Sequence, residues 1–246
     1  EFANVGWLIT LVDMTEIRRA LQQRDQALHF ISHDIRAPNA SILTLLEMQR
    51  NSMEPLQADE LLKRIEKYAQ ASLSMAESFV RLASAQNNEY RVAPLDLASV
   101  LQDAVDDAWT QASNQEVSVT ILQIPHSAPC VGDRPLLARA MANVLNNAIK
   151  YSPARGTVRC SLYARGPNWV ISIRDEGPGI DPAQQDRLFK PFSRLHDQTH
   201  PNISGVGLGL ALVHTVVKRH GGSLELESAV GQGAEFRLVL PASASD

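Results

Sequence analysis

A change of hydrophobic period near residue 87 constrains the fold of this chain more than any other feature. Across residues 58–86, apolar and small side chains recur at alternating spacings of four and three, the pattern of a coiled-coil seam. The seam positions are Leu61, Ile65, Tyr68, Ser72, Met75, Phe79 and Leu82. Residues 16–49 follow a similar heptad pattern, which Pro38 interrupts, and a turn over residues 51–57 joins the two segments. Residues 16–89 are therefore predicted to form an antiparallel helical hairpin.

A hairpin of this kind presents two apolar seams and cannot bury both by itself. Pairing with a second copy of the chain into a dimeric four-helix bundle buries both, and this homodimer is the arrangement we expect. In the alternative arrangement, the hairpin packs only against the rest of its own chain.

After a polar linker over residues 90–94, strands and helices are mixed, which predicts a second domain over residues 95–241 and a tail at 242–246. Helices are expected at 95–112, 133–151 and 208–220, with a short helix opening at 181–182. Strands are expected at 117–124, 157–164, 169–174, 223–228 and 234–240. This order predicts a mixed sheet with helices on one face, which is a two-layer α/β sandwich.

The composition narrows the classes of partner. The formal net charge is −4, which argues against a nucleic-acid partner, because such proteins favour a basic stripe. The two cysteines, Cys130 and Cys160, have no metal-ligand spacing to histidines, so we expect buried free thiols rather than a disulfide.

The sequence opens, without Met, in a strand-like segment over residues 6–12 that has no strand to pair with. The segment is far shorter than the ~20 apolar residues that span a membrane. We therefore expect the chain to be part of a longer protein. This part is expected to lie in the cytoplasm, with any anchor in the inner membrane lying further upstream.

His33 is the first candidate for chemistry. In the heptad frame it takes an f position, which points away from the seam, and Asp34 beside it can hold one ring N–H. The other ring nitrogen is then free to act as a nucleophile. Pro38 cannot donate to the carbonyl of Asp34, so the helix is loosened just past the histidine. The alternative is an ordinary surface histidine.

A second group lies on the helix expected at 133–151, where Asn143, Asn147 and Lys150 share one face. Amide oxygens suit a hydrated Mg²⁺, and an ammonium group offsets phosphate charge. An ordinary solvated polar face is the alternative.

Two glycine-rich segments complete the set of candidates. Asp175-Glu176-Gly177-Pro178-Gly179-Ile180 follows a strand, where a carboxylate can accept a hydrogen bond from an exocyclic amine such as that of adenine. Gly205-Val206-Gly207-Leu208-Gly209 opens a helix, where main-chain amides favour phosphate. This second segment is neither a Walker A loop nor a convincing dinucleotide fingerprint. A glycine turn between elements is the alternative for the first.

Residues 181–204 between these segments are a candidate ligand lid. They contain Leu188-Phe189-Lys190-Pro191-Phe192. His196 and His200 also lie here, four residues apart, but no helix or acidic partner supports a metal site.

Together these motifs resemble the transmitter core of bacterial sensor histidine kinases over residues 16–241. Residues 33–38 look like the H box, residues 143–151 the N box, residues 175–180 the G1 box, residues 188–192 the F box and residues 205–209 the G2 box. The first 15 residues also look like the end of a PAS-like sensor domain. The resemblance implies the GHKL (Bergerat) ATP-binding fold for the sandwich.

The resemblance also implies roles for individual residues. His33 is the phosphoacceptor and Asp34 its acid/base helper; ATP and Mg²⁺ are the cofactors, with Asn147 as the Mg²⁺ ligand. The nucleotide-binding set is Asn143, Asn147, Lys150, Tyr151, Asp175, Gly177, Gly179, Ile180, Phe189, Gly205, Gly207, Leu208 and Gly209. The implied partner is the receiver domain of a response regulator, which accepts the phosphoryl group on an aspartate.

The sequence departs from the family pattern at two positions. Ala37 stands where Thr or Asn is common four residues after the histidine, so we expect weak phosphatase activity toward the regulator. Ala234 stands where Ser or Thr is usual, which removes a minor phosphate contact.

Two other functions compete with this interpretation. One is a nucleotide-binding module without catalysis, which the presence of both His33 and Asn147 disfavours. The other is a GHKL ATPase of the chaperone or mismatch-repair type, which needs an acidic base in the N-box helix; residues 140–143 offer none.

Overall fold

The computed structural model describes residues 14, 35–52, 55–87, 90–185, 187–189 and 207–243. The chain divides into two compact units, residues 1–76 and 77–246, and each is described by itself. The predicted strand in the first residues and the start of the first predicted helix lie outside the described residues.

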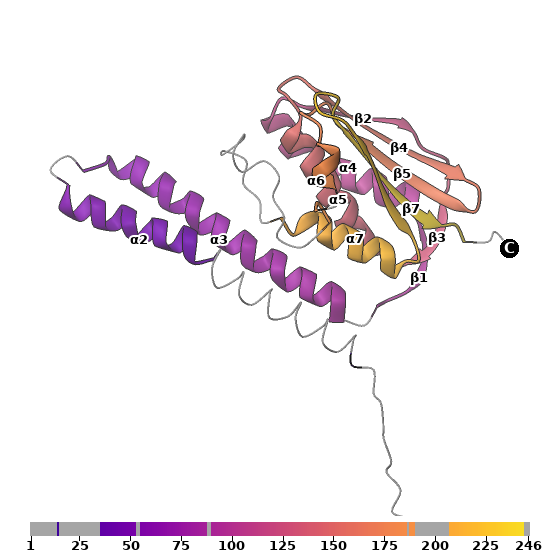
Figure 1. The fold of residues 1–246 in the computed structure, drawn as a ribbon, viewed down its shortest axis with the longest axis horizontal. Helices are drawn as coiled ribbons and strands as arrows, with labels where there is room; N and C mark the ends of the chain where they lie inside the picture. Colours follow the sequence, from indigo (N-terminus) through magenta and orange to yellow (C-terminus); the bar gives the residue numbers. More distant parts are fainter. Residues whose placement is uncertain are drawn as a thin grey trace, which may run out of the picture. The chain divides into compact units, whose positions relative to one another are not determined.

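The described part of the first unit is a helical hairpin (Figure 1). Helix α2 spans Arg36–Asn51, and helix α3 begins at Ala58 and runs to Asn87. The turn between them is fixed by Gln49, whose side-chain amide donates to the carbonyl of Leu56 and accepts from its N–H at 2.9 and 2.8 Å. The helices and turn predicted over residues 36–87 are therefore confirmed.

The seam of the hairpin is only half-buried, as at Ile42, Leu45, Leu61 and Ile65. Several large apolar side chains of the hairpin are exposed outright: Leu43, Leu46, Met48, Leu62 and Leu73. One hairpin therefore leaves much of its apolar surface in contact with solvent.

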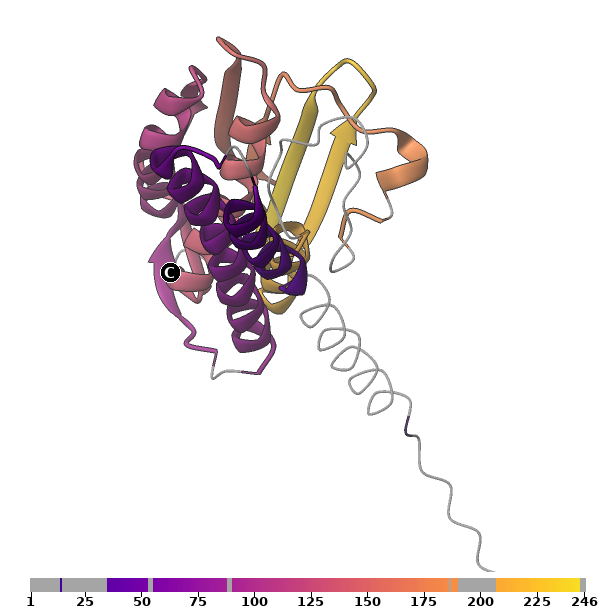
Figure 2. The same ribbon diagram turned by 90° about the vertical axis from the view of Figure 1, so that its left-hand side faces the viewer.

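The second unit is built on a five-stranded sheet with the order β2-β4-β5-β7-β6. The strands are β2 (Ser118–Gln123), β4 (Thr157–Arg165), β5 (Asn168–Arg174), β6 (Ser223–Ser228) and β7 (Ala234–Pro241). Strands β2 and β4 are parallel, and the other neighbours are antiparallel. Figure 2 shows β6 and β7 side by side. The predicted mixed sheet is confirmed.

Three helices cover one face of this sheet (Figure 1): α4 (Leu97–Asn114), α5 (Arg134–Tyr151) and α7 (Gly209–Arg219). Alternate strand residues such as Cys160, Ile171 and Phe236 are buried between sheet and helices. The short helix α6 (Pro182–Gln185) follows β5. This is the predicted two-layer sandwich.

Two short strands are missing from the sequence prediction. Strand β1 (Ala93–Asp96) pairs antiparallel with β3 (Pro129–Gly132), so β1 occupies the end of the predicted linker and the start of the predicted helix. The helix prediction from residue 95 was wrong by two residues, because Asp96 adopts an extended conformation and caps α4. Each strand is four residues long and contains a proline, so only the long-range pairing reveals them.

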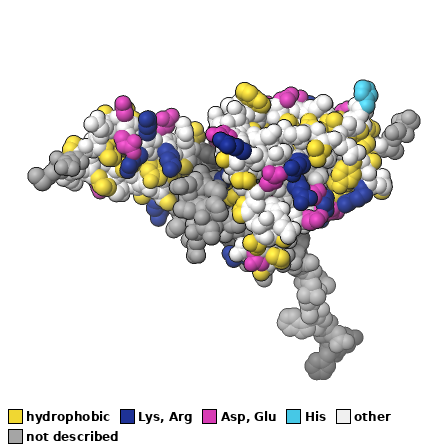
Figure 3. Space-filling model, turned by 90° about the horizontal axis from the view of Figure 1, so that it is seen from above, with side chains coloured by type: hydrophobic (Ala, Val, Ile, Leu, Met, Phe, Trp, Pro, Cys, Tyr) yellow, Lys and Arg dark blue, Asp and Glu magenta, His cyan; other side chains and the backbone are white. Residues whose placement is uncertain are grey.

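The opposite face of the sheet carries charged side chains in ion pairs. Arg159 pairs with Glu176 at 2.8 Å, and Arg165 pairs with Glu225 at 2.6 Å. Figure 3 shows acidic and basic side chains intermingled on the face in view. Exposed pairs of this kind add little stability. A largely antiparallel sheet can leave one face in contact with water, and this charged face is such a solvated surface.

Candidate nucleotide-binding site

Helix α5 carries the first part of the site. Asp133 caps it, since its carboxylate accepts from the N–H of Leu136 at 3.1 Å, and a proline is tolerated in the first turn. Met141 and Val144 are fully buried, whereas Asn143 and Asn147 are half-buried. The helix therefore separates a core face from a polar face, as the spacing predicted.

The first turn of α7 approaches this polar face. A Cβ atom built at Gly209 would lie 3.7 Å from Cγ of Asn143 and 3.8 Å from its Oδ1. Gly207 just before the helix has a φ of +72°, and Leu208 is buried. Residues of the predicted N and G2 boxes, which are far apart in the sequence, are thus brought together.

Asp175 lies directly after β5 and is 6% exposed. Its Oδ1 accepts from the N–H groups of Gly177 at 2.8 Å and Ala234 at 3.1 Å. Burial raises the pKa of Asp175, against the lowering effect of these two N–H groups. Oδ2 has no hydrogen-bond partner among the described residues, so one oxygen of a fixed carboxylate can accept from a ligand.

The Asp175 loop also meets the end of α5. A Cβ atom at Gly177 would lie only 2.8 Å from the main-chain oxygen of Tyr151. Lys150 holds its ammonium group 5.3 Å from the centre of the Tyr151 ring. The loop after β5 therefore closes against the C-terminal turn of α5, and glycine permits the close approach.

A second contact supports the other end of this loop, at Gly179 and Ile180. The N–H of Ile180 donates to Oγ of Ser228 at 2.9 Å, and Gln185 donates to the carbonyls of Ile180 and Ser228. Ser228 and Gln185 belong to none of the motifs that predicted the site. In the sequence, the glycines at 231 and 233 mark the turn from β6 to β7, and they were the signal that could have indicated this contact.

Phe189 stacks on His214 of α7 with ring centroids 5.9 Å apart. Leu188 and Phe189 also pack at the margin of the core. Within the predicted lid, Leu188 and Phe189 are therefore held against the core, and Phe189 also contacts α7. Among the predicted site residues His33, Asp34 and Gly205 lie outside the described residues, as do His196 and His200.

Asp175 and Glu176 line a cavity of about 430 Å³, together with the strand residues Arg159, Ser161, Ser172 and Arg174. These strand residues alternate with the core-facing residues of β4 and β5, so the cavity opens on the solvated face of the sheet. Asp175 follows the end of β5, so it lines this cavity and also belongs to the loop that meets α5.

The residues present fit ATP and Mg²⁺. Asp175 has an oxygen available for an exocyclic amine, and Gly177 and Gly179 let the loop after Asp175 pack closely against the main chain of Tyr151 and Ala229. Asn147 offers an amide oxygen, a hard ligand that Mg²⁺ takes together with water and phosphate oxygens.

Residues 132–244 match the family described as histidine kinase-, DNA gyrase B-, and HSP90-like ATPases, which is an ATP-binding fold. A solved structure of the mycobacterial sensor histidine kinase MprB is 34% identical, with a TM-score of 0.53, and covers 62% of this chain and 98% of its own.

Two further comparisons extend across the hairpin. The adaptive-response sensory kinase SasA of Synechocystis sp. is 30% identical over 93% of this chain. This chain spans only 62% of the length of that curated relative. A structure of histidine kinase ThkA in complex with response regulator protein TrrA shares the fold, with a TM-score of 0.73 at 16% identity, over 96% of this chain and 68% of its own.

A helical hairpin followed by an ATP-binding α/β sandwich with this constellation of amides, carboxylate and glycines defines a kinase transmitter core. The chain belongs to the sensor histidine kinases. Within the described part of the chain, no helix has both the length and the apolar character to cross a membrane.

Proposed function

We propose that this chain transfers the γ-phosphoryl group of ATP to His33 and passes it to an aspartate on a response-regulator receiver domain. The observation that carries the proposal is the convergence of three segments on one site. Asn143 on α5 meets Gly209 on α7, and Gly177 of the loop after β5 meets Tyr151 at the end of α5. These contacts align an amide-bearing helix, a helix N-terminus and a fixed carboxylate, which suit phosphate and adenine.

The proposed chemistry is phosphoryl transfer by positioning and charge neutralisation. A ring nitrogen of His33 attacks the γ-phosphorus, so an N–P bond forms while the bond to the bridging oxygen of ADP breaks. Asp34 accepts the proton from the other ring nitrogen. Lys150 screens the triphosphate, and Asp175 orients the adenine. Mg²⁺ held by Asn147 would supply further neutralisation of the phosphate charge.

The homodimer is part of the same proposal. The exposed leucines of α2 and α3 leave an apolar surface on the hairpin that a second hairpin can cover. ThkA is crystallised with a response regulator, and by analogy we infer that a receiver domain binds this hairpin. We also expect the kinase core to face the cytoplasm.

Radiolabelled ATP tests the proposal. The purified chain should acquire label that is labile in acid and stable in base, and His33→Gln should abolish labelling while ATP still binds. Label that persists in His33→Gln would overturn the assignment of the acceptor. Steady ATP hydrolysis without labelled protein would favour the chaperone-type ATPase, and ATP binding without either reaction would favour a non-catalytic module.

Mixing two inactive variants resolves which subunit supplies the ATP. His33→Gln lacks the acceptor and Asn147→Asp lacks the amide ligand. Label that appears only in the mixture indicates transfer between subunits of a dimer. Label absent from the mixture indicates transfer within one subunit.

The exposed Ala37 on α2 also has a testable consequence. A methyl group cannot orient water toward the phosphoryl group of the regulator, so we propose weak phosphatase activity. Ala37→Thr supplies a hydroxyl and should accelerate loss of phosphate from the regulator with little effect on labelling of His33. An unchanged rate would contradict the role given to this position.

A further inference from the structure

One carboxylate joins the segment after α3 to the ATP-binding unit. The main-chain N–H of Arg91 donates to Oδ2 of Asp133 at 3.1 Å. The other oxygen of Asp133 caps α5 through the N–H of Leu136. Asp133 is 7% exposed, so its carboxylate is largely shielded from water. The position of Arg91 is therefore tied to the first turn of α5.

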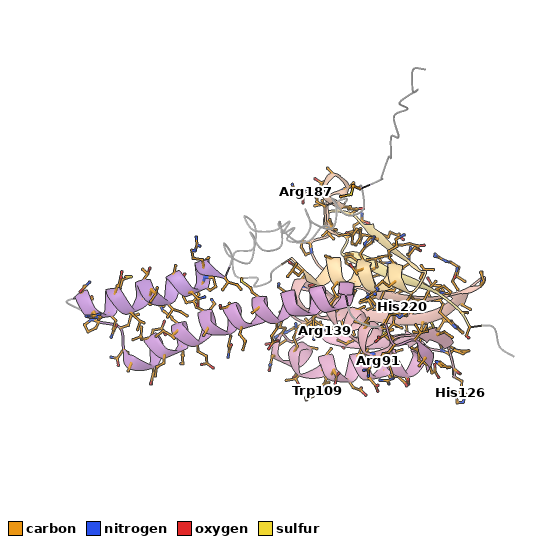
Figure 4. The ribbon with its side chains drawn as sticks, turned by 90° about the horizontal axis from the view of Figure 1, so that it is seen from below. Arg91, Trp109, His126, Arg139, Arg187 and His220 are labelled. Carbon is orange, nitrogen blue, oxygen red and sulfur yellow. The ribbon has the colours of Figure 1, made fainter. Side chains whose placement is uncertain are left out.

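His220, at the end of α7, completes this arrangement (Figure 4). The N–H of Asp133 donates to Nε2 of His220 at 3.0 Å, and Nδ1 lies 2.7 Å from the carbonyl oxygen of Val216. A ring that accepts at Nε2 and faces a carbonyl at Nδ1 is neutral, with its proton on Nδ1. A Cβ atom at Gly132 would lie 2.5 Å from the ring, so glycine is required beneath it.

Tyr90 adds an aromatic contact from the linker side. Its ring meets His220 edge-on, with centroids 4.9 Å apart and planes at 79°. Arg219 lies 5.4 Å from the centre of the same ring. Burial, more than the nearby Asp133, raises the pKa of Tyr90 to about 12, so it remains a neutral phenol. We refer to Tyr90, Arg91, Asp133 and His220 as the linker clasp.

The clasp lies on the two helices that also carry the nucleotide site. Helix α5 runs from Asp133 toward Asn143, and α7 runs back from Gly209, beside Asn143, to His220. At a rise of about 1.5 Å per residue, ten residues of helix place the clasp about 15 Å from that contact. Two rigid helices therefore connect the linker to the ATP site.

We propose that the linker clasp positions the ATP-binding unit for transfer to His33, with His220 and Asp133 acting as positioning residues rather than as ligands of ATP. The proposal rests on the function proposed above. Because Tyr90 follows the end of α3 at Asn87 by three residues, an anchor there limits the orientations that the ATP-bearing unit can take. Such restriction raises the effective concentration of ATP at its acceptor.

A matched pair at Arg91 tests the hydrogen bond to Asp133. The N–H of Val92 donates to the carbonyl of Tyr90 at 3.2 Å, so Arg91 is the central residue of a γ-turn. Among the described residues, those with positive φ do not include Arg91, and an inverse γ-turn has a φ of about −75°, which proline accepts. Arg91→Pro thus removes the donor at a φ that proline accepts, and Arg91→Ala keeps the donor.

At saturating ATP, Arg91→Pro in the full chain should label His33 roughly 10-fold more slowly or worse, with the Kd for ATP changed by less than about two-fold. Arg91→Ala should match the unaltered chain in both measurements. Equal labelling rates in the two variants would overturn the proposal. So would a loss of ATP affinity that parallels the loss of rate, because the clasp would then act by maintaining the ATP site.

A second pair of variants, at His220, tests the linker clasp without introducing a proline. His220→Leu leaves the N–H of Asp133 without an acceptor, whereas the amide oxygen of His220→Gln can replace Nε2. The leucine variant should label slowly and the glutamine variant should recover most of the rate. Slow labelling in both variants, or a near-normal labelling rate in both, would contradict the hydrogen-bonded role of the ring.

Trypsin gives a readout that does not depend on kinase activity, because Arg91 is exposed and sits in the clasp. Cleavage after Arg91 should be slow in the unaltered chain and roughly 10-fold faster in Tyr90→Ala and His220→Leu, as local opening becomes easier. If the unaltered chain takes no label on His33 yet shows this cleavage pattern, the proposed function is wrong, but the linker clasp still holds the linker in place. If His33 is labelled but neither variant is cleaved faster, the proposal for the linker clasp is wrong and the proposed kinase function is unaffected.

Discussion

The main-chain oxygen of Ala229 lies so close to Gly179 that a Cβ atom there would overlap with it. The N–H of Gly231 reinforces this approach by donating to the carbonyl of Pro178 at 2.6 Å. The turn between β6 and β7 is thereby fixed against the loop that carries Asp175. The geometry of the adenine side of the site depends on this main-chain contact.

Gly179→Ala is therefore expected to displace the Asp175 loop and abolish detectable ATP binding, as measured by calorimetry. Gly166 provides a matched control, because its φ of +59° is close to the +70° of Gly179 but nothing lies within 4 Å of its Cβ position. Gly166→Ala should cost only the left-handed backbone strain of about 1–2 kcal/mol and leave ATP affinity intact. Equal ATP affinity in the two variants would show that the contact with Ala229 is unimportant.

Asp175→Asn should change which purine the site prefers. Oδ1 accepts two N–H groups, so an asparagine must place its oxygen there and its NH₂ group at the ligand-facing position. An NH₂ group opposes the adenine amine but can donate to the 6-oxo group of inosine. Affinity for ATP should fall roughly 10- to 150-fold, which corresponds to about 1.5–3 kcal/mol, while the ratio of inosine triphosphate to ATP affinity rises. A parallel loss of both nucleotides would contradict this geometry.

The neutral state of His220 predicts how stability varies with pH. Burial, opposed by the carbonyl of Val216 and by Asp133 and assisted by Arg219, lowers the pKa of His220 below its ordinary value of 6.5. Tyr90 also faces the ring but stays neutral in this range. In the window between the lowered folded pKa and 6.5, the unfolded chain binds the proton and the folded chain does not. The contribution of His220 to the free energy of unfolding is therefore fully present above pH 6.5 and is lost as the pH falls through that window.

Urea unfolding followed by tryptophan fluorescence between about pH 5 and about pH 8 measures this effect. His220→Gln cannot titrate, so the free energy of unfolding of this variant should fall less on acidification. The difference between the two curves removes the contribution of His214, whose pKa burial also lowers. Parallel curves would show that the ring is not the titrating group.

The hairpin leucines predict the oligomeric state. Leu62 and Leu73 are each 62% exposed and lie on one face of α3. Each leucine buried in a dimer contributes about 1.5–3 kcal/mol, so Leu62→Glu with Leu73→Glu should convert the dimer to a monomer in sedimentation measurements. Lys67→Glu adds the same charge at an exposed position of α3 that carries no apolar side chain, and it should leave the dimer intact. A monomeric unaltered chain would contradict the dimer itself.

The cysteines should be inert in the folded protein. Burial raises the pKa of Cys160 to about 12 and also raises that of Cys130, so neither is a thiolate near neutral pH. Iodoacetamide should modify neither residue until denaturant is added, as mass spectrometry can show. Rapid modification of the native chain would mean that the β4 and β3 positions open readily.

Local patterns determined much of this protein. The period of Leu61, Ile65 and Tyr68 predicted the hairpin, because a helix repeats its faces every few residues regardless of what it packs against. In the sandwich, the spacing of Asn143 and Asn147 predicted their shared face for the same reason. The glycines at 177 and 179 marked a close main-chain approach without showing what approaches.

The tertiary structure decided which distant segments meet. Strand β1 was missed because Pro94 and a length of four residues hide it until β3 supplies a partner. Gly179 faces Ala229, and His220 accepts from Asp133, only because the sheet order and the antiparallel path of α5 and α7 bring them together. A hydrogen bond or steric contact between remote residues depends on packing, and no local periodicity records it.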